Sequence, residues 1–187
     1  YAEQLLRSFN EMYGLNYLVL RYFNVYGPRM DTEGVYTEVF IRWMERISKG
    51  LPPIILGDGE QTMDFVYATD IARANILAMA SSASDQIFNI ASGDETSLNM
   101  LARYMCSLMD SDLSPRYQGA RNVNSVVRRL AETERTQEKL GFKSEIGIEE
   151  GLQNLITWWR EQKGISEINH LEIDVDELEF ENLRGAD

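Results

Sequence analysis

Cysteine and histidine are nearly absent from this sequence, and long apolar runs are missing. The single cysteine, Cys106, has no partner in the chain for a disulfide, which fits a reducing, cytoplasmic compartment. The single histidine, His170, argues against histidine-based catalysis and against histidine-rich metal sites. No stretch approaches the roughly 20 apolar residues that cross a bilayer, and no signal-peptide pattern opens the chain, so we expect no membrane association.

Basic side chains are also scarce, since 18 Lys and Arg stand against 30 Asp and Glu and the net charge is −12. This balance argues against nucleic acids and anionic membranes as partners, because both bind basic surfaces. Residues 166–187 hold eight acids and one base, so they carry −7 of that charge. We expect 165–187 to be a solvated acidic tail. Its alternating Leu171, Ile173 and Val175 leave open an edge strand or a docking segment.

The rest of the chain has the composition of a globular protein, with 44% hydrophobic and 26% charged residues. It opens in mid-helix: Leu5, Phe9 and Met12 share one face and Gly14 is a C-cap candidate, but no N-cap precedes Tyr1. A helix with an end and no beginning suggests a fragment of a longer protein.

Strand and helix patterns then alternate, which predicts an α/β fold. We expect Thr69 or Asp70 to N-cap one helix, and "GDGEQ" to be the turn of a hairpin. The expected strands cover 16–23, 52–56, 63–70, 86–92, 114–118 and 124–130, and the expected helices 37–49, 71–80, 93–110, 133–140 and 148–163.

The stretch "LRYFNVYGP" places polar and aromatic groups at the end of an apolar strand. Ligands of open α/β sheets bind beyond the carboxyl ends of the strands, where Tyr22, Phe23 and Asn24 would lie. An aromatic there can pack on a flat heterocycle, and an amide can both donate to and accept from a phosphate or a sugar. The alternative is that the two rings are core aromatics and Asn24 is a turn residue.

Five blocks occur in order: "LRYFNVYGPR", "GDGEQTMDFVYATDIARA", "FNIASGD", "VVRRLAETERTQEKLGF" and "IEEGLQNLITWW". Together they resemble the C-terminal half of the extended short-chain dehydrogenases/reductases, the NAD-dependent nucleotide-sugar epimerases and dehydratases such as UDP-glucose 4-epimerase. The resemblance covers about 1–163. It implies the last strands of a parallel Rossmann-type sheet, followed by a small α/β substrate domain.

The resemblance also implies domain limits and a missing catalytic pair. Residues 1–35 would be a remnant of the NAD-binding domain, 36–164 mostly the substrate-binding domain, and 64–92 would return partly to the Rossmann sheet. The family's glycine-rich turn and Tyr-x-x-x-Lys pair are absent, and the pair is expected just before Tyr1. We therefore expect no activity from this chain alone, and expect NAD to be bound mainly by the missing half.

Site residues follow from the resemblance by position. Tyr22 and Phe23 would lie against the nicotinamide of NAD, and Asn24 would bind the sugar-nucleotide diphosphate. For a UDP- or dTDP-sugar, the resemblance implies that the backbone amides of Thr37, Glu38 and Val39 bind the nucleotide. The backbone of the strand Ile54, Ile55 and Leu56 would read the base. Arg128 or Arg129 would clamp the diphosphate. The alternative for the two arginines is that they are surface residues flanking a strand, without a ligand.

One position departs from the family. Many relatives carry a diphosphate-binding arginine before the "DF" of "TMDFVY", where this chain has Met63. We expect Arg29 or the Arg128/Arg129 pair to compensate.

The implied reaction is oxidation at the sugar C4 with hydride transfer to NAD, and return of the hydride from the other face. Elimination by a 4,6-dehydratase is the alternative for the parent enzyme, and a non-catalytic binding or assembly module is the alternative for this chain. The family also implies a homodimer, formed through the helix of Tyr1–Tyr13.

Overall fold

The computed structural model describes residues 1–33, 39–119 and 126–164. Helices and strands alternate within these ranges, which confirms the predicted α/β fold. The helices are α1 (Ala2–Tyr13), α2 (Val39–Ser48), α3 (Ala68–Ala80), α4 (Leu98–Leu108), α5 (Glu134–Leu140) and α6 (Ile148–Lys163). The strands are β1 (Leu18–Tyr22), β2 (Asn24–Tyr26), β3 (Ile54–Leu56), β4 (Thr62–Met63), β5 (Phe65–Tyr67), β6 (Gln86–Ile90), β7 (Thr96–Ser97), β8 (Arg116–Gln118) and β9 (Arg128–Arg129).

The described strands form four small sheets. Three are parallel pairs, β1 with β6, β2 with β5 and β3 with β8, and in the fourth β4 lies between β7 and β9. Only the β4–β7 pair is antiparallel among these. Parallel partners need long connections, and each connection here contains at least one helix.

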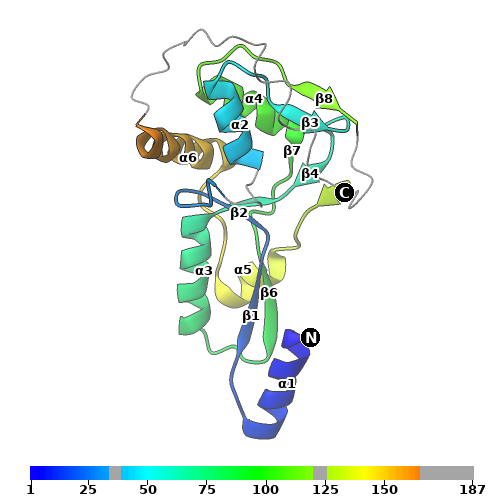
Figure 1. The fold of residues 1–187 in the computed structure, drawn as a ribbon. Helices are drawn as coiled ribbons and strands as arrows, with labels where there is room; N and C mark the ends of the chain where they lie inside the picture. The colour runs from blue at the N-terminus through cyan, green and yellow to red at the C-terminus, as the bar shows by residue number, and fades with distance from the viewer. Residues whose placement is uncertain (34–38, 120–125, 165–187) are drawn as a thin grey trace.

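The larger core lies in the upper half of Figure 1, where α2, α4 and α6 surround the small strands. Apolar residues recur at helical spacing on these three helices, and their inner faces are fully buried. Aromatic rings join this core to β2 and β5: Tyr26 stacks on Phe40 at 5.1 Å between ring centroids and meets Phe65 and Tyr67 edge-on. Burial raises the pKa of Tyr26.

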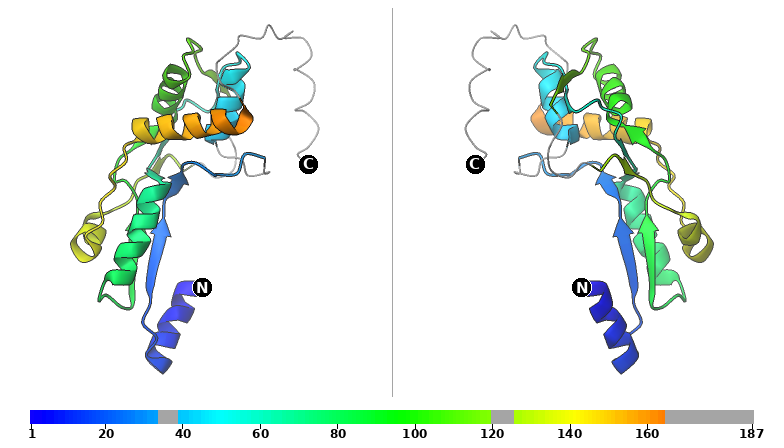
Figure 2. Two further views of the ribbon diagram at one scale, coloured as in Figure 1. Left: turned by 90° about the vertical axis from the view of Figure 1, so that its left-hand side faces the viewer. Right: turned by 90° about the vertical axis from the view of Figure 1, so that its right-hand side faces the viewer.

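A second, smaller core lies in the lower half, between the β1–β6 pair and helices α3 and α5. It consists of Ala74, Phe88, Ile90, Leu140 and Phe142. Figure 2 shows α3 and α5 on one side of β1 and α1 on the other. Strand β5 contributes Phe65 and Tyr67 to the larger core, and helix α3, which follows it directly, contributes Ala74 to the smaller core. The predicted domain limits therefore remain a prediction.

Most predicted helix ends are confirmed. Gly14, Gly141 and Gly164 end α1, α5 and α6 in the left-handed conformation that glycine adopts without strain. At the start of α4 the Ser97 hydroxyl accepts a hydrogen bond from the Met100 amide. The predicted start of α2 near Thr37 lies outside the described residues.

The hairpin predicted at "GDGEQ" is wrong. The segment is a turn, in which the Asp58 carboxylate accepts from the Glu60 amide at 3.0 Å. The flanking strands do not pair with each other, because β3 pairs with β8 and β4 with β7 and β9. Glycine-rich turns therefore located the bend correctly but carried no information about strand partners.

The capping role predicted for Thr69 or Asp70 is also wrong. Helix α3 begins at Ala68 and has no side-chain cap. Asp70 lies in its first turn and is buried, and its carboxylate accepts from the backbone of Glu145 and Ile146 and from the Ser144 hydroxyl. It therefore joins α3 to the segment before α6 instead of closing the helix.

Strand β1 is only partly covered, although an apolar run of this kind is typical of strands buried on both faces. Leu18, Val19 and Leu20 are half-buried, and the last residues of the strand are exposed. In the described part of the chain β1 pairs with β6 alone, so its other edge has no strand beside it.

Candidate functional site

The predicted ligand-facing residues begin where β1 and β6 end together. The strands run parallel with Tyr22 opposite Ile90, and the Phe23 amide donates to the Ile90 carbonyl at 3.0 Å. Tyr22 is 46% exposed, and its hydroxyl donates to Asn75 of α3 at 2.9 Å. An exposed ring held by its hydroxyl presents a flat apolar face at the carboxyl end of the sheet, which suits a planar heterocycle.

Asn24 is held beside Asp64. The Asn24 backbone and side-chain amides both donate to the Asp64 carbonyl, at 3.2 and 2.8 Å. The Asp64 carboxylate has no exposed surface, and it accepts from the Ser92 amide and hydroxyl and from the Gly93 amide at 2.7–3.0 Å. A buried carboxylate with this many donors fixes the chain segments around it.

The same residue reaches β9. The Asp64 amide donates to the Arg129 carbonyl at 2.8 Å, and Ala131 donates its amide to the carboxylate at 3.4 Å. Asn24 and Arg129, which are far apart in the sequence, are therefore both bonded to one residue. The structure brings these two predicted site residues together.

The two arginines of β9 lie on opposite faces of the sheet. Parallel register places Arg128 beside Thr62 and Arg129 beside Met63, and successive side chains of a strand point to opposite faces. Arg128 forms a two-bond ion pair with Glu95, with both bonds at 2.8 Å. Arg129 is partly buried and has no carboxylate partner among the described residues.

Glu95 also accepts from the Thr62 hydroxyl at 2.7 Å. The Arg128 guanidinium and this hydroxyl lower the pKa of the Glu95 carboxyl to about 2. The pair is consequently charged at neutral pH.

The other predicted substrate contacts are dispersed. Thr37 and Glu38 lie outside the described residues, and Val39 opens α2 with its side chain against the larger core. In β3 the Ile55 side chain is fully buried, and the carbonyls of the flanking residues are already bonded. The carbonyl of Ile54 accepts from the Trp43 indole at 3.0 Å, and that of Leu56 from the Gln61 amide at 2.9 Å.

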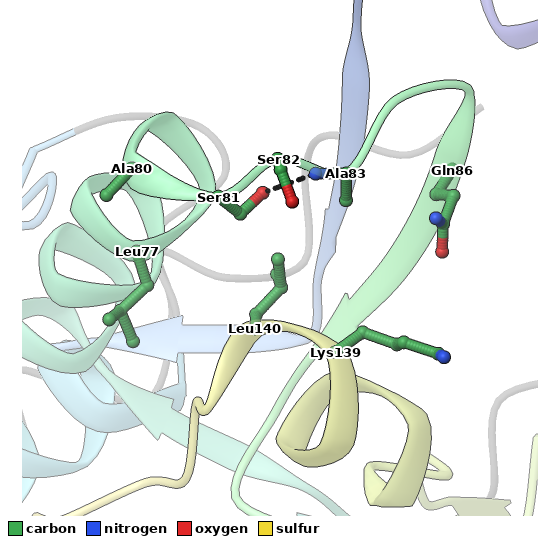
Figure 3. Close-up of a pocket in the computed structure, with 8 residues that line it drawn as sticks. All are labelled: Leu77, Ala80, Ser81, Ser82, Ala83, Gln86, Lys139 and Leu140. Carbon is green, nitrogen blue, oxygen red and sulfur yellow. Dashed lines mark hydrogen bonds between the residues drawn. The ribbon is translucent and has the colours of Figure 1, made fainter.

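Two surface hollows in the described part of the chain could hold a ligand. One of about 440 Å³ is lined by Arg128, Leu130, Ala131 and Glu132, next to the candidate site. The larger one, of about 560 Å³, lies at the opposite, amino-terminal end of β6 (Figure 3). Figure 3 shows it between the ends of α3 and α5, with Leu77 and Leu140 among the residues that line it. It is shallow and has no cluster of charged groups, so we place the chemistry at the carboxyl end.

Comparisons with known proteins relate the chain to nucleotide-sugar epimerases. A family model described as "NAD dependent epimerase/dehydratase family" matches residues 1–91. The solved UDP-glucose 4-epimerase of Thermotoga maritima, with UDP-glucose, is 37% identical and superimposes with a TM-score of 0.80 over 86% of this chain and 51% of that one. The chain thus resembles the NAD-dependent epimerase/dehydratase family, over about half the length of the proteins it matches.

Two further proteins are similar over the same share of this chain. The UDP-N-acetylglucosamine 4-epimerase of Methanobrevibacter ruminantium, in complex with UDP-N-acetylmuramic acid, is 37% identical with a TM-score of 0.80 over 86% of this chain and 51% of its own. The UDP-glucuronate 4-epimerase of Thermodesulfobacterium geofontis is 32% identical over 161 residues, 86% of this chain and 48% of its own length. The chain spans about half the length of the curated relatives it matches.

Sequence reasoning missed the residues that organise this candidate site. Asp64 and Glu95 were not singled out, although an acid between apolar strand residues in "MDFVY" is a signal for a buried, bonded carboxylate. Glu95 offered no such signal, because its partners Thr62 and Arg128 are distant in the sequence.

The described ranges contain no metal-binding cluster and no membrane-spanning helix. No group of His, Cys, Asp or Glu among those residues could hold a metal ion. The helices described here are all too short or too polar to cross a bilayer.

Proposed function

We propose that this chain forms the substrate-binding half of an NAD-dependent nucleotide-sugar 4-epimerase. The observation that carries the proposal is the junction at Asp64, which bonds Asn24 and Arg129 at the carboxyl end of the sheet. An amide and a guanidinium, carried by two segments that Asp64 joins, suit a sugar-nucleotide diphosphate. Epimerisation is preferred to dehydration because the solved relatives at 37% identity are 4-epimerases.

NAD fits the exposed aromatic end of β1. Tyr22 offers a ring that is 46% exposed, and Phe23 follows it at the strand end. A relative from Thermus thermophilus, a UDP-glucose 4-epimerase that is 27% identical, was solved in complex with NAD. When bound, NAD would accept a hydride from the sugar C4 and return it. The residues of this chain would pack on the nicotinamide and hold the diphosphate, and we assign no catalytic base within the chain.

We assign the diphosphate clamp to Arg129 rather than Arg128. Arg129 stands in register with Met63, the position where many family members carry arginine, so its guanidinium can replace the missing charge. Arg128 faces the other side and is neutralised by Glu95. Asn24, Thr37, Glu38 and Val39 would complete the phosphate contacts, and β3 would read the base through its backbone.

The first prediction separates the two arginines. Arg129→Ala should weaken UDP binding about tenfold or more, because a charge-assisted contact to phosphate is lost. Arg128→Ala should weaken it less, since that guanidinium faces Glu95. Calorimetric titration with UDP measures both, and equal losses, or a larger loss for Arg128→Ala, would contradict the assignment.

The proposal as a whole is tested by titrating the chain with UDP-glucose and, separately, with NAD. We expect the sugar nucleotide to bind without NAD, because the proposed phosphate contacts lie within the chain. If neither ligand binds, the titration is repeated with the full-length gene product. Absence of UDP-glucose binding there as well would refute the proposed function and favour an interaction module.

Partners and compartment follow from the same proposal. We propose a UDP- or dTDP-sugar as the substrate, a homodimer formed through α1, and a cytoplasmic location consistent with the single cysteine. The apolar face of α1 supports the dimer, since none of its residues is buried.

A further inference from the structure

Strand β9 is two residues long, and few bonds hold it in place. Its backbone contacts to neighbouring segments include the Thr62 amide donating to the Val127 carbonyl at 3.0 Å and the Asp64 amide donating to the Arg129 carbonyl at 2.8 Å. Val127 is 69% exposed, so little apolar burial anchors the strand. Such a short strand needs side-chain contacts to keep its register.

Glu95 supplies those contacts. Its carboxylate bonds Arg128 of β9 through both oxygens and Thr62 of β4 through one of them, so a single side chain fastens the two strands together. It comes from a third segment, the turn that leads into β7, and β7 pairs with β4 on the opposite edge from β9. A bidentate guanidinium–carboxylate pair is geometrically specific, so it fixes the face on which Arg128 lies.

Fixing Arg128 also fixes its neighbour. Because successive side chains alternate, holding Arg128 on the Thr62 face obliges Arg129 to lie on the Met63 face. A slip of one residue would exchange the two arginines and remove the charge from that face. The negative charge of Glu95 does not oppose a phosphate there, because it lies on the other face and is paired.

We propose that Glu95 is a positioning residue for the diphosphate site, acting through Arg128 and the register of β9 to place Arg129 beside Met63. The inference rests on the proposed function, since it assigns Arg129 to a phosphate. It makes Glu95 necessary for anion binding although Glu95 itself carries the wrong charge for an anion.

A double-mutant cycle tests it, with UDP as the probe and calorimetry as the readout, in whichever form of the protein binds UDP. Glu95→Gln should weaken UDP binding about tenfold, because it loses the charge that holds Arg128. In an Arg129→Ala background the same change should have almost no further effect, since the residue that Glu95 positions is gone. Asp94→Asn, an exposed acid in the same turn, is the matched control and should leave binding unchanged.

The outcomes are distinguishable. Wild-type affinity in Glu95→Gln overturns the inference and leaves the proposed function standing. Additive losses in the double variant also overturn it, because Glu95 would then act independently of Arg129. Failure of the wild-type protein to bind UDP in any form refutes the proposed function and this inference with it. Thermal melting of each variant shows whether a loss of UDP affinity reflects unfolding. Thr62→Val keeps the Glu95–Arg128 ion pair and should therefore reduce UDP affinity less than Glu95→Gln.

Discussion

Asp70 shows how one buried side chain can connect distant parts of the chain. It is 2% exposed and accepts hydrogen bonds from Arg73 on its own helix, from the Ser144 hydroxyl and from the amides before α6. Burial by itself raises the pKa of this carboxyl, but the Arg73 guanidinium, the Ile146 amide and the Ser144 hydroxyl outweigh it and lower the pKa overall. The ionised form is therefore the one that the fold stabilises.

A substitution at this position tests the argument. Asp70→Asn should lower the free energy of unfolding at pH 7 by about 2–4 kcal/mol, because several donors lose a charged acceptor. Since the pKa is lower in the folded state, this stabilisation is present above about pH 4 and is lost as the pH falls through the folded-state value. The gap between wild type and variant should thus close in acid.

Urea denaturation at pH 7 and at several values below 4 measures that gap. Asp112→Asn, which changes an exposed acid, is the control and should alter stability by less than about 0.5 kcal/mol. A gap that stays constant with pH would show that the charge of Asp70 is not what matters.

Helix α6 packs unusually close to β2 at one point. Gly151 is buried in the helix, and a Cβ added there would lie 2.0 Å from the Tyr26 hydroxyl oxygen and 2.7 Å from the ring carbon that bears it. Tyr26 is fully enclosed by other aromatic rings and cannot move aside. The absence of a side chain at this position therefore sets the distance between α6 and the sheet.

Gly151→Ala should destabilise the protein by about 1–3 kcal/mol, the usual effect of overpacking a core. Intrinsic helix propensity predicts the opposite sign, because alanine is favoured over glycine in a helix by about 1 kcal/mol. Gly147→Ala at the N-cap of the same helix, where an added Cβ meets nothing within 4 Å, is the control and should cost about 0.5–1 kcal/mol, the usual difference between glycine and alanine at that position. Denaturant melts of the two variants compare them, and a stabilised Gly151→Ala would refute the packing argument.

At the scale of the whole molecule, α1 is attached by polar contacts and leaves its apolar face uncovered. Arg21 pairs with Glu3 at 2.6 Å and Arg7 with Asp85 at 3.6 Å, whereas Leu5, at 47%, remains substantially exposed. Phe9 and Met12 on the same face are 43% and 70% exposed. Amphipathic helices gain most of their stability by burying such a face.

We expect the chain to self-associate through this face. Replacing Leu5 and Phe9 together by lysine should shift the protein toward monomer, because charges would then face each other across the contact. Light scattering over a range of concentrations measures this. Met79→Lys on α3, where the side chain is 79% exposed, is the control and should leave the association unchanged. Wild-type protein that stays monomeric at high concentration would contradict the expectation.

The sequence by itself determined the features that depend on near neighbours along the chain. The helix end at Gly14 and the bounds of α6 were both predicted, because backbone conformation and local hydrogen bonds set them. The strand positions were largely correct for the same reason, since apolar runs bounded by turn residues are local patterns.

Only the tertiary structure decided which segments meet. Pairing of β3 with β8, the buried role of Asp70 and the junction at Asp64 all join residues that are dozens of positions apart. The stretch "VVRRL" contains two adjacent arginines, and only the alignment of β9 with β4 assigns each of them to one face of the sheet. The physical reason is that register, burial and ion pairing depend on which segments lie side by side, whereas a local pattern constrains only the residues within it.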